Sequence, residues 1–154
     1  MKKTCALTGH RELPADFNKN ALYEALENLI LEGCDTFLCG MAEGFDLLAL
    51  ECLSSLRQKY RIFTEACIPY QGREQRFSSA RYRALYFKLL PACDKQTILS
   101  DKYFNGVFLT RDRYMVDHCD VVFAYCNKEC GGTYYTVSYA KSKNIPVRYF
   151  EQNP

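Results

Sequence analysis

Residues 121–140 have the sequence VVFAYCNKECGGTYYTVSYA, in which a run of five apolar or aromatic residues comes shortly before two glycines and a threonine. The apolar run predicts a buried strand, and the stretch that follows the glycines has the residue spacing of a helix. Glycines at such a junction let a ligand approach the backbone closely, and the first N–H groups of the helix attract an anion. This stretch therefore predicts a strand, a cradle for a phosphate-bearing ligand, and a helix.

Short apolar runs alternate with longer helical stretches along the whole chain. Strands are predicted over Thr4–Gly9, Asp35–Gly40, Arg61–Pro69, Lys95–Ser100, Asp120–Tyr125 and Ile145–Phe150. Helices are predicted over Asn18–Glu32, after Asp46, over Glu74–Leu90, within residues 106–119 after a loop, and from the glycine pair onward. Apolar strands that are separated by helices indicate a parallel sheet covered on both faces. We expect an α/β fold, a Rossmann-like three-layer sandwich with a mostly parallel sheet, in a single domain over residues 1–154.

The composition excludes several classes of protein. With 48% hydrophobic and 25% charged residues the chain is an ordinary globular sequence, and its net charge of +2 disfavours nucleic acid as a partner. No apolar run approaches the roughly 20 residues that span a bilayer, and the first residues do not form a secretory signal, so we expect no membrane contact. Nine cysteines without a C-x-x-C pair indicate reduced thiols in a cytoplasmic protein. We expect neither a metal site nor a cofactor.

Candidate ligand contacts gather where the predicted strands end, because ligands of an open parallel sheet bind beyond the carboxyl ends of its strands. The candidates are Thr8, Gly9, His10 and Arg11 after the first strand, Gly40, Glu43 and Gly44 after the second, Arg76 after the third, and Gly131, Gly132, Thr133 and Thr136 after the fifth.

Two arginines precede the fifth predicted strand. We expect Arg111 and Arg113 on the polar side of a helix or in the loop before it, where a planar guanidinium suits the bidentate capture of a phosphate. The alternative for either is a surface ion pair. Tyr134, Tyr135 and Tyr139 either stack on a base or pack at the sheet edge.

The motifs TGHR, GMAEGFDLLA, PYQGREQRF, RDRYMVD and GGTYYTVSYAKSKNIPV occur in this order over nearly the whole chain. In this they resemble the YpsA-like proteins of the SLOG superfamily, which also holds DprA and the LOG-type phosphoribohydrolases. The resemblance implies a Rossmann-like fold with a nucleotide-related ligand over the strand ends. Matched motif by motif, the resemblance implies ligand contacts at Gly9, His10, Arg11, Gly40, Gly44, Asp46, Arg111, Gly131, Gly132 and Thr133.

One position departs from the pattern of the LOG-type enzymes. Those enzymes use P-G-G-x-G-T-x-x-E, in which the glutamate serves catalysis. Here the proline and one glycine are missing, and Thr136 stands where the glutamate would be. Because a threonine is neither a carboxylate acid nor a base, this departure favours a binding protein over an enzyme.

Three functions remain open from the sequence. The first is the binding or sensing of a nucleotide or nucleotide-derived small molecule, such as an ADP-ribose-like compound or a nucleoside phosphate. The second is an N-glycosidic hydrolase or transferase for nucleoside monophosphates, with Glu43 or Asp46 as the acid or base, although we prefer Asp46 as a helix cap and Glu43 as a solvated residue. The third is a single-stranded nucleic-acid or protein-interaction module. A homodimer is also left open.

Overall fold

The computed structural model describes residues 2–151, and in these residues strands and helices alternate. The strands are β1 (Lys3–Gly9), β2 (Cys34–Cys39), β3 (Phe63–Ile68), β4 (Lys95–Ile98), β5 (Val121–Tyr125) and β6 (Val147–Tyr149). The α-helices are α1 (Lys19–Leu31), α2 (Phe45–Leu56), α3 (Ala80–Leu89), α4 (Val107–Asp117) and α5 (Gly131–Ser142). Two short 3-10 helices are η1 (Arg73–Arg76) and η2 (Leu90–Ala92).

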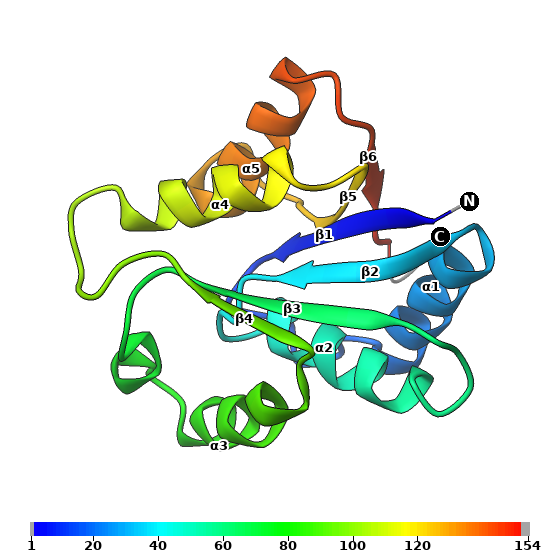
Figure 1. Ribbon diagram of the computed structural model, residues 1–154, viewed down its shortest axis with the longest axis horizontal. Coiled ribbons are helices and arrows are strands. Elements are labelled where there is room, and N and C mark those ends of the chain that lie inside the picture. Colours follow the sequence, from blue (N-terminus) through cyan, green and yellow to red (C-terminus); the bar gives the residue numbers. More distant parts are fainter. Residues whose placement is uncertain (1, 152–154) are drawn as a thin grey trace.

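The strands form one parallel sheet in the order β4-β3-β2-β1-β5-β6. Helices α4 and α5 cover one face of this sheet, and α1, α2 and α3 lie on the other (Figure 1). The three-layer α/β prediction is therefore confirmed, with a sheet that is parallel throughout. After β4 the chain returns to the far side of β1, so the strand order reverses between β1 and β5. In an open α/β sheet a crevice opens at such a reversal, beyond the carboxyl ends of the strands.

Two apolar layers hold the helices to the sheet. On one face Leu22 and Leu26 of α1 pack in the same cluster as Phe37 of β2 and Leu53 of α2. Helix α2 is buried over most of its circumference because it packs on the sheet and also contacts both α1 and α3. The smaller layer on the other face joins residues of α4 and α5 to β1 and β5, with Val116 and Val122 among the fully buried side chains. The burial of these apolar surfaces fixes the positions at which β1, β2 and β5 end.

The single helix predicted over Glu74–Leu90 is wrong. The structure has η1 at its start, an extended Phe77, and then α3, which begins after Ser79. The Ser79 hydroxyl accepts a hydrogen bond from the amide of Tyr82 at 3.3 Å, as an N-cap serine does. Phe77 is 4% exposed, so the chain leaves the helical conformation where this ring enters the core.

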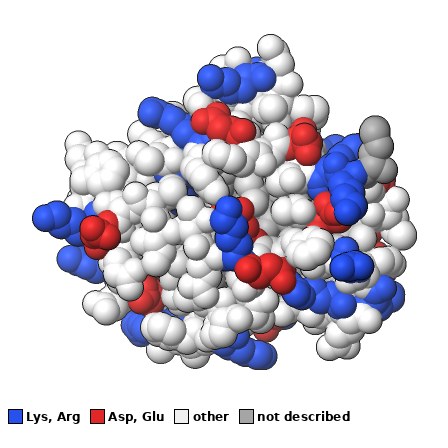
Figure 2. Space-filling model, in the orientation of Figure 1, with Lys and Arg blue, Asp and Glu red and all other residues white. Residues whose placement is uncertain are grey.

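The charged residues on the face shown in Figure 2 are of both signs and interspersed, without a continuous basic stripe. None of the helices among residues 2–151 is long and apolar enough to cross a membrane. All nine cysteines are unpaired thiols, and most of them are buried.

Candidate functional site

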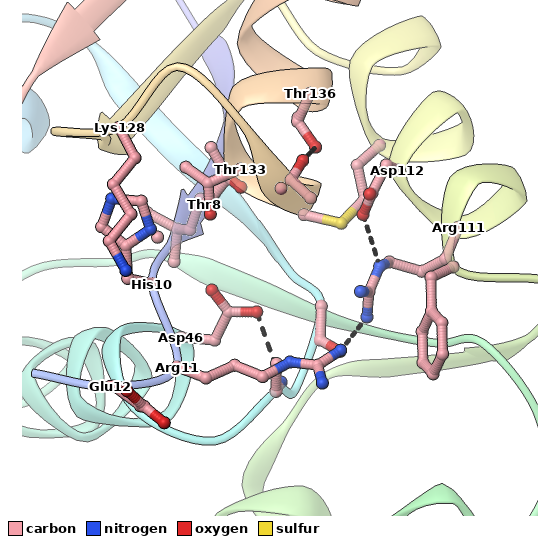
Figure 3. Close-up of a pocket in the computed structure, with 18 of the residues that line it drawn as sticks. Thr8, His10, Arg11, Glu12, Asp46, Arg111, Asp112, Lys128, Thr133 and Thr136 are labelled. Carbon is pink, nitrogen blue, oxygen red and sulfur yellow. Dashed lines mark hydrogen bonds and ion pairs between the residues drawn. The ribbon is translucent and has the colours of Figure 1, made fainter.

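A cleft of about 540 Å³ opens where the carboxyl ends of β1 and β5 diverge (Figure 3). Its walls come from the end of β1, the loops after β1, β2 and β5, the starts of α2 and α5, and one side of α4. Eleven of the residues singled out in the sequence line it, namely Thr8, Gly9, His10, Arg11, Gly40, Asp46, Arg111, Gly131, Gly132, Thr133 and Thr136.

The start of α5 forms one open corner of this cleft. Gly131 has a φ of +90°, a conformation that favours glycine, and the preceding Cys130 makes no side-chain hydrogen bond to cap the helix. A Cβ atom added at Gly131 or Gly132 would meet no atom within 4 Å. The first N–H groups of a helix have no partner within the helix, and its N-terminus carries a partial positive charge. This corner therefore has room for an anion and the groups to attract one.

The two threonines of α5 are buried beside this corner. Thr133 is 8% exposed and Thr136 is 2% exposed. The Thr136 hydroxyl donates a hydrogen bond to the carbonyl of Gly132 at 3.0 Å. Thr136, which stands at the position of the LOG-type glutamate, thus forms its hydrogen bond within its own helix.

His10 joins the loops after β1, β2 and β5. Its Nε2 accepts a hydrogen bond from the amide of Asn127 at 3.0 Å, and its carbonyl accepts one from the amide of Phe45 at 3.1 Å. Burial, and then the charge of Lys128, lower the pKa of the imidazole. A neutral ring with Nε2 as acceptor carries its proton on Nδ1. The histidine therefore holds two sides of the cleft together.

Two glycines let these loops pack closely. A Cβ at Gly9 would lie 2.3 Å from the ring of Phe45. Gly44 has a φ of +83°, and a Cβ there would lie 2.3 Å from the carbonyl oxygen of Arg11. Gly44, a predicted ligand contact, does not line the cleft but lies against the loop after β1.

Arg111 lies inside the protein, and its expected position on the polar side of a helix or in a loop is wrong. It is 7% exposed, its Nε donates to Asp112 at 2.7 Å, and its Nη1 donates to the carbonyl of Gly40 at 2.5 Å. Burial alone would lower the pKa of this guanidinium, but the carboxylates of Asp112 and Asp46 outweigh burial and raise it. Arg111 is a fixed positive charge in the wall of the cleft (Figure 3).

Asp46 is the buried carboxylate of the cleft, and the prediction that it caps α2 is wrong. The N-cap is Gly44, and Asp46 lies in the first turn, 5% exposed. Its Oδ2 accepts a hydrogen bond from the amide of Ala42 at 3.3 Å, whereas its Oδ1 is buried without a hydrogen-bond partner among the described residues. Burial raises the pKa of Asp46 to about 7, although Arg111 lowers it. Near neutral pH this carboxyl can therefore give or take a proton.

Glu43, the other carboxylate considered for catalysis, lies outside the cleft. It is 9% exposed, so the expectation that it is solvated is wrong. It accepts hydrogen bonds from the amide of Ser79 at 3.0 Å and from the hydroxyl of Ser78 at 3.3 Å. Glu43 thereby holds the start of α3.

Arg76 and Arg113 also lie outside this cleft. Arg76 lines two adjoining hollows near η1. Arg113 donates a hydrogen bond to the hydroxyl of Tyr135 at 2.6 Å, and the hydroxyl of Tyr139 donates to Asp117 at 2.9 Å. These contacts between α4 and α5 occupy both tyrosines, neither of which lines the cleft.

Other residues line the cleft without having been singled out as ligand contacts, among them Glu12, Ala42, Phe108, Asp112, Met115, Lys128 and Cys130. Lys128 and Cys130 lie within three residues before the glycine pair, so their position in the loop after β5 could have identified them as cleft residues. Phe108 gave no such signal, because an aromatic residue in the first turn of a helix is usually a packing residue.

Comparison with known proteins agrees with this architecture. The YpsA family model, described as the YspA SLOG family, matches residues 9–151. A search of the curated proteins gives no match. DNA processing protein A (DprA) from Streptococcus pneumoniae superposes with a TM-score of 0.69 and 18% identity, over 96% of this chain and 50% of that chain.

Two further structures are similar. DprA from Helicobacter pylori, which binds single-stranded DNA, has a TM-score of 0.68 and 18% identity, over 96% of this chain and 64% of that chain. A molybdenum cofactor binding protein from Rippkaea orientalis has a TM-score of 0.60 and 19% identity, over 97% of this chain and 76% of that chain. This chain thus spans half to two thirds of the length of the DprA proteins. At these identities the likeness shows the fold alone. The family model covers nearly the whole chain, and the chain therefore belongs to the YpsA family of SLOG proteins.

Proposed function

We propose that this domain binds a nucleotide or a nucleotide-derived small molecule in the cleft between β1 and β5. The observation that carries the proposal is the open start of α5, where Gly131 and Gly132 leave room beside unsatisfied helix amides. A phosphate of the ligand occupies this corner.

The charges around the corner suit such a ligand. Arg11 and Lys128 line the cleft, and neither forms an ion pair within residues 2–151. Arg111 already donates to Asp112 and Gly40, so its part is a fixed positive charge in the wall. The unpartnered Oδ1 of Asp46 is an acceptor for a ribose hydroxyl. A nucleoside phosphate carries both a phosphate and ribose hydroxyls, which are the groups that this arrangement would bind.

Calorimetric titration and thermal shift with AMP test the proposal, with adenosine as the ligand that lacks the phosphate. At 100 times its Kd, AMP adds about 2.7 kcal/mol to the free energy of unfolding, which in a domain of this size raises Tm by roughly 5–10 °C. We expect AMP to bind and adenosine to bind at least tenfold more weakly.

The matched variant is Gly132→Ala, which adds one methyl group in the space beside the proposed phosphate. No protein atom lies within 4 Å of the added carbon, so the variant should fold. Alanine is also the better helix former by up to about 1 kcal/mol. We expect an unchanged or higher Tm without ligand and at least tenfold weaker AMP binding. Equal AMP affinity in the two proteins would contradict the placement of the phosphate.

A second candidate function is hydrolysis of the N-glycosidic bond of a nucleoside monophosphate. The buried Asp46, with a pKa of about 7, favours it. In this reaction water attacks the anomeric carbon, the C–N bond breaks, and protonated Asp46 gives its proton to the leaving base. The attacking water loses a proton to solvent, from which Asp46 is protonated again, and the products are the free base and ribose 5-phosphate. Chromatography of nucleoside monophosphates after incubation tests it. Release of free base that is lost in Asp46→Asn is the expected result, and release that survives this substitution would contradict the assignment.

Single-stranded DNA is the ligand of the Helicobacter pylori relative. The net charge of this chain is only +2, which favours a small molecule over a long nucleic-acid strand as its ligand. The one face drawn in Figure 2 shows no continuous basic stripe.

A further inference from the structure

A second hollow of about 480 Å³ adjoins the cleft. It is lined by Arg11, Tyr70, Arg73, Arg76, Tyr103 and Phe108, which we call the arginine subsite. Arg11 and Phe108 line the cleft as well, so the two spaces share a wall. A ligand that occupied both spaces would therefore pass beside Arg11 and Phe108.

Three guanidinium groups surround the ring of Phe108. The Cζ atoms of Arg11, Arg73 and Arg111 lie 5.3, 5.1 and 5.9 Å from its centroid. A cation over an aromatic face is attracted by the ring, but three cations at one ring repel each other. Among the described residues, the fold pairs only one of these three groups, that of Arg111, with a carboxylate.

Arg111 forms an ion pair with Asp112, whereas the arginines of the subsite have no such partner in the described part of the chain. Within residues 2–151, Arg11, Arg73 and Arg76 form no ion pair. Arg73 is only 7% exposed, and burial, followed by the charge of Arg11, lowers the pKa of its guanidinium. Arg73 lies over the rings of Phe77 and Phe108 without a carboxylate partner among these residues, so an anion placed between these side chains would offset the cost of its burial.

Aromatic rings form the rest of the subsite. The ring centroids of Tyr70 and Tyr103 are 5.7 Å apart, and that of Tyr103 lies 6.3 Å from that of Phe108. Tyr103 is 58% exposed, which leaves its ring accessible. An exposed ring beside guanidinium groups suits a flat base that is linked to a phosphate.

We propose that the arginine subsite binds a second phosphate and its adjoining base, so that the ligand of the cleft is a dinucleotide. This inference rests on the proposed function, because the first phosphate lies at the start of α5. The second phosphate is the link between the two nucleotides, and Arg11, Arg73 and Arg76 contact it from the shared wall and the subsite. The second base lies on Tyr103.

Titration of AMP and of the 5′-phosphorylated dinucleotide pApA tests this inference in the wild type and in Arg76→Gln. Arg76 is exposed, so its substitution should leave the fold intact, which a thermal melt verifies. The matched control is Arg81→Gln, which removes the same charge from an exposed residue of α3 that does not line the subsite.

We expect the wild type and Arg81→Gln to bind pApA at least tenfold more tightly than AMP. Arg76→Gln should lose most of that preference while its AMP affinity stays within twofold of the wild type. If the wild type binds AMP and pApA equally, or Arg76→Gln keeps the full preference, the arginine subsite is refuted while the phosphate site at α5 stands. If AMP does not bind to the wild type, the proposed function fails, and this inference with it. Affinity that keeps rising tenfold with each nucleotide added beyond two would refute the subsite in favour of an extended single strand.

Discussion

Replacement of Asp46 by asparagine should change how the stability of the protein depends on pH. The folded pKa of Asp46 is about 7, and its ordinary value is 3.8. Between these two values the folded state keeps a proton that the unfolded state releases, so the free energy of unfolding falls as pH rises, by about 1.4 kcal/mol per pH unit. The loss amounts to about 4 kcal/mol and is complete above the folded pKa. Asparagine has no proton to lose, so Asp46→Asn should be more stable than the wild type by about 4 kcal/mol at pH 8, and no more than slightly different at pH 4.

Urea denaturation at several pH values between 4 and 8, followed by circular dichroism, measures this difference. The matched control is Glu24→Gln, which removes one carboxylate from the exposed surface of α1. A difference between Asp46→Asn and the wild type that is the same at every pH would refute the conclusion that burial raises the pKa of this carboxyl. It would also remove the basis for Asp46 as an acid in the hydrolase candidate.

Two more predictions concern the loops that form the cleft. Gly44→Ala should destabilise the protein by about 2–3 kcal/mol or more, because its φ is +83° and the added carbon lies 2.3 Å from the carbonyl of Arg11. Gly106→Ala, at a φ of +93° and a ψ of 3°, measures the strain of a left-handed residue that is not crowded by other parts of the chain, and an equal loss of Tm in both variants would contradict the role assigned to close packing. Cys130 is exposed at the mouth of the cleft, so saturating AMP should slow its alkylation by a maleimide several-fold. Cys126, which does not line the cleft, is the internal reference in the mass-spectrometric readout, and an unaltered Cys130 rate with AMP bound would contradict the proposed position of the ligand.

The layers and the order of elements could be predicted because apolar runs of strand length and helical periodicity are local properties of the sequence. The break before α3 could not, because it depends on Phe77 entering a core that distant segments build. The N-cap of α2 could not be predicted for the same reason. Asp46 precedes an apolar helix as an N-cap residue would, but Gly44 takes that place, since only a glycine fits beside the loop after β1.

The open start of α5 followed from two glycines between a strand and a helix, a signal that lies within a few residues. The partners of Arg111 did not follow, because the carbonyl of Gly40 is 71 residues away in the chain and meets the guanidinium only in the folded sheet. The cluster around Phe108 likewise joins residues of the β1 loop, η1 and α4. The homodimer that the sequence leaves open has no support in these observations.

If the amides at the start of α5 bind the phosphate of a ligand, they should respond to AMP directly. Titration of ¹⁵N-labelled protein with AMP, followed in ¹H–¹⁵N correlation spectra, observes these groups. We expect the amide resonances of Gly131, Gly132 and Thr133 to move downfield in proportion to occupancy and by more than any others. Saturable AMP binding that leaves these three resonances in place and moves those of another surface would contradict this placement of the phosphate.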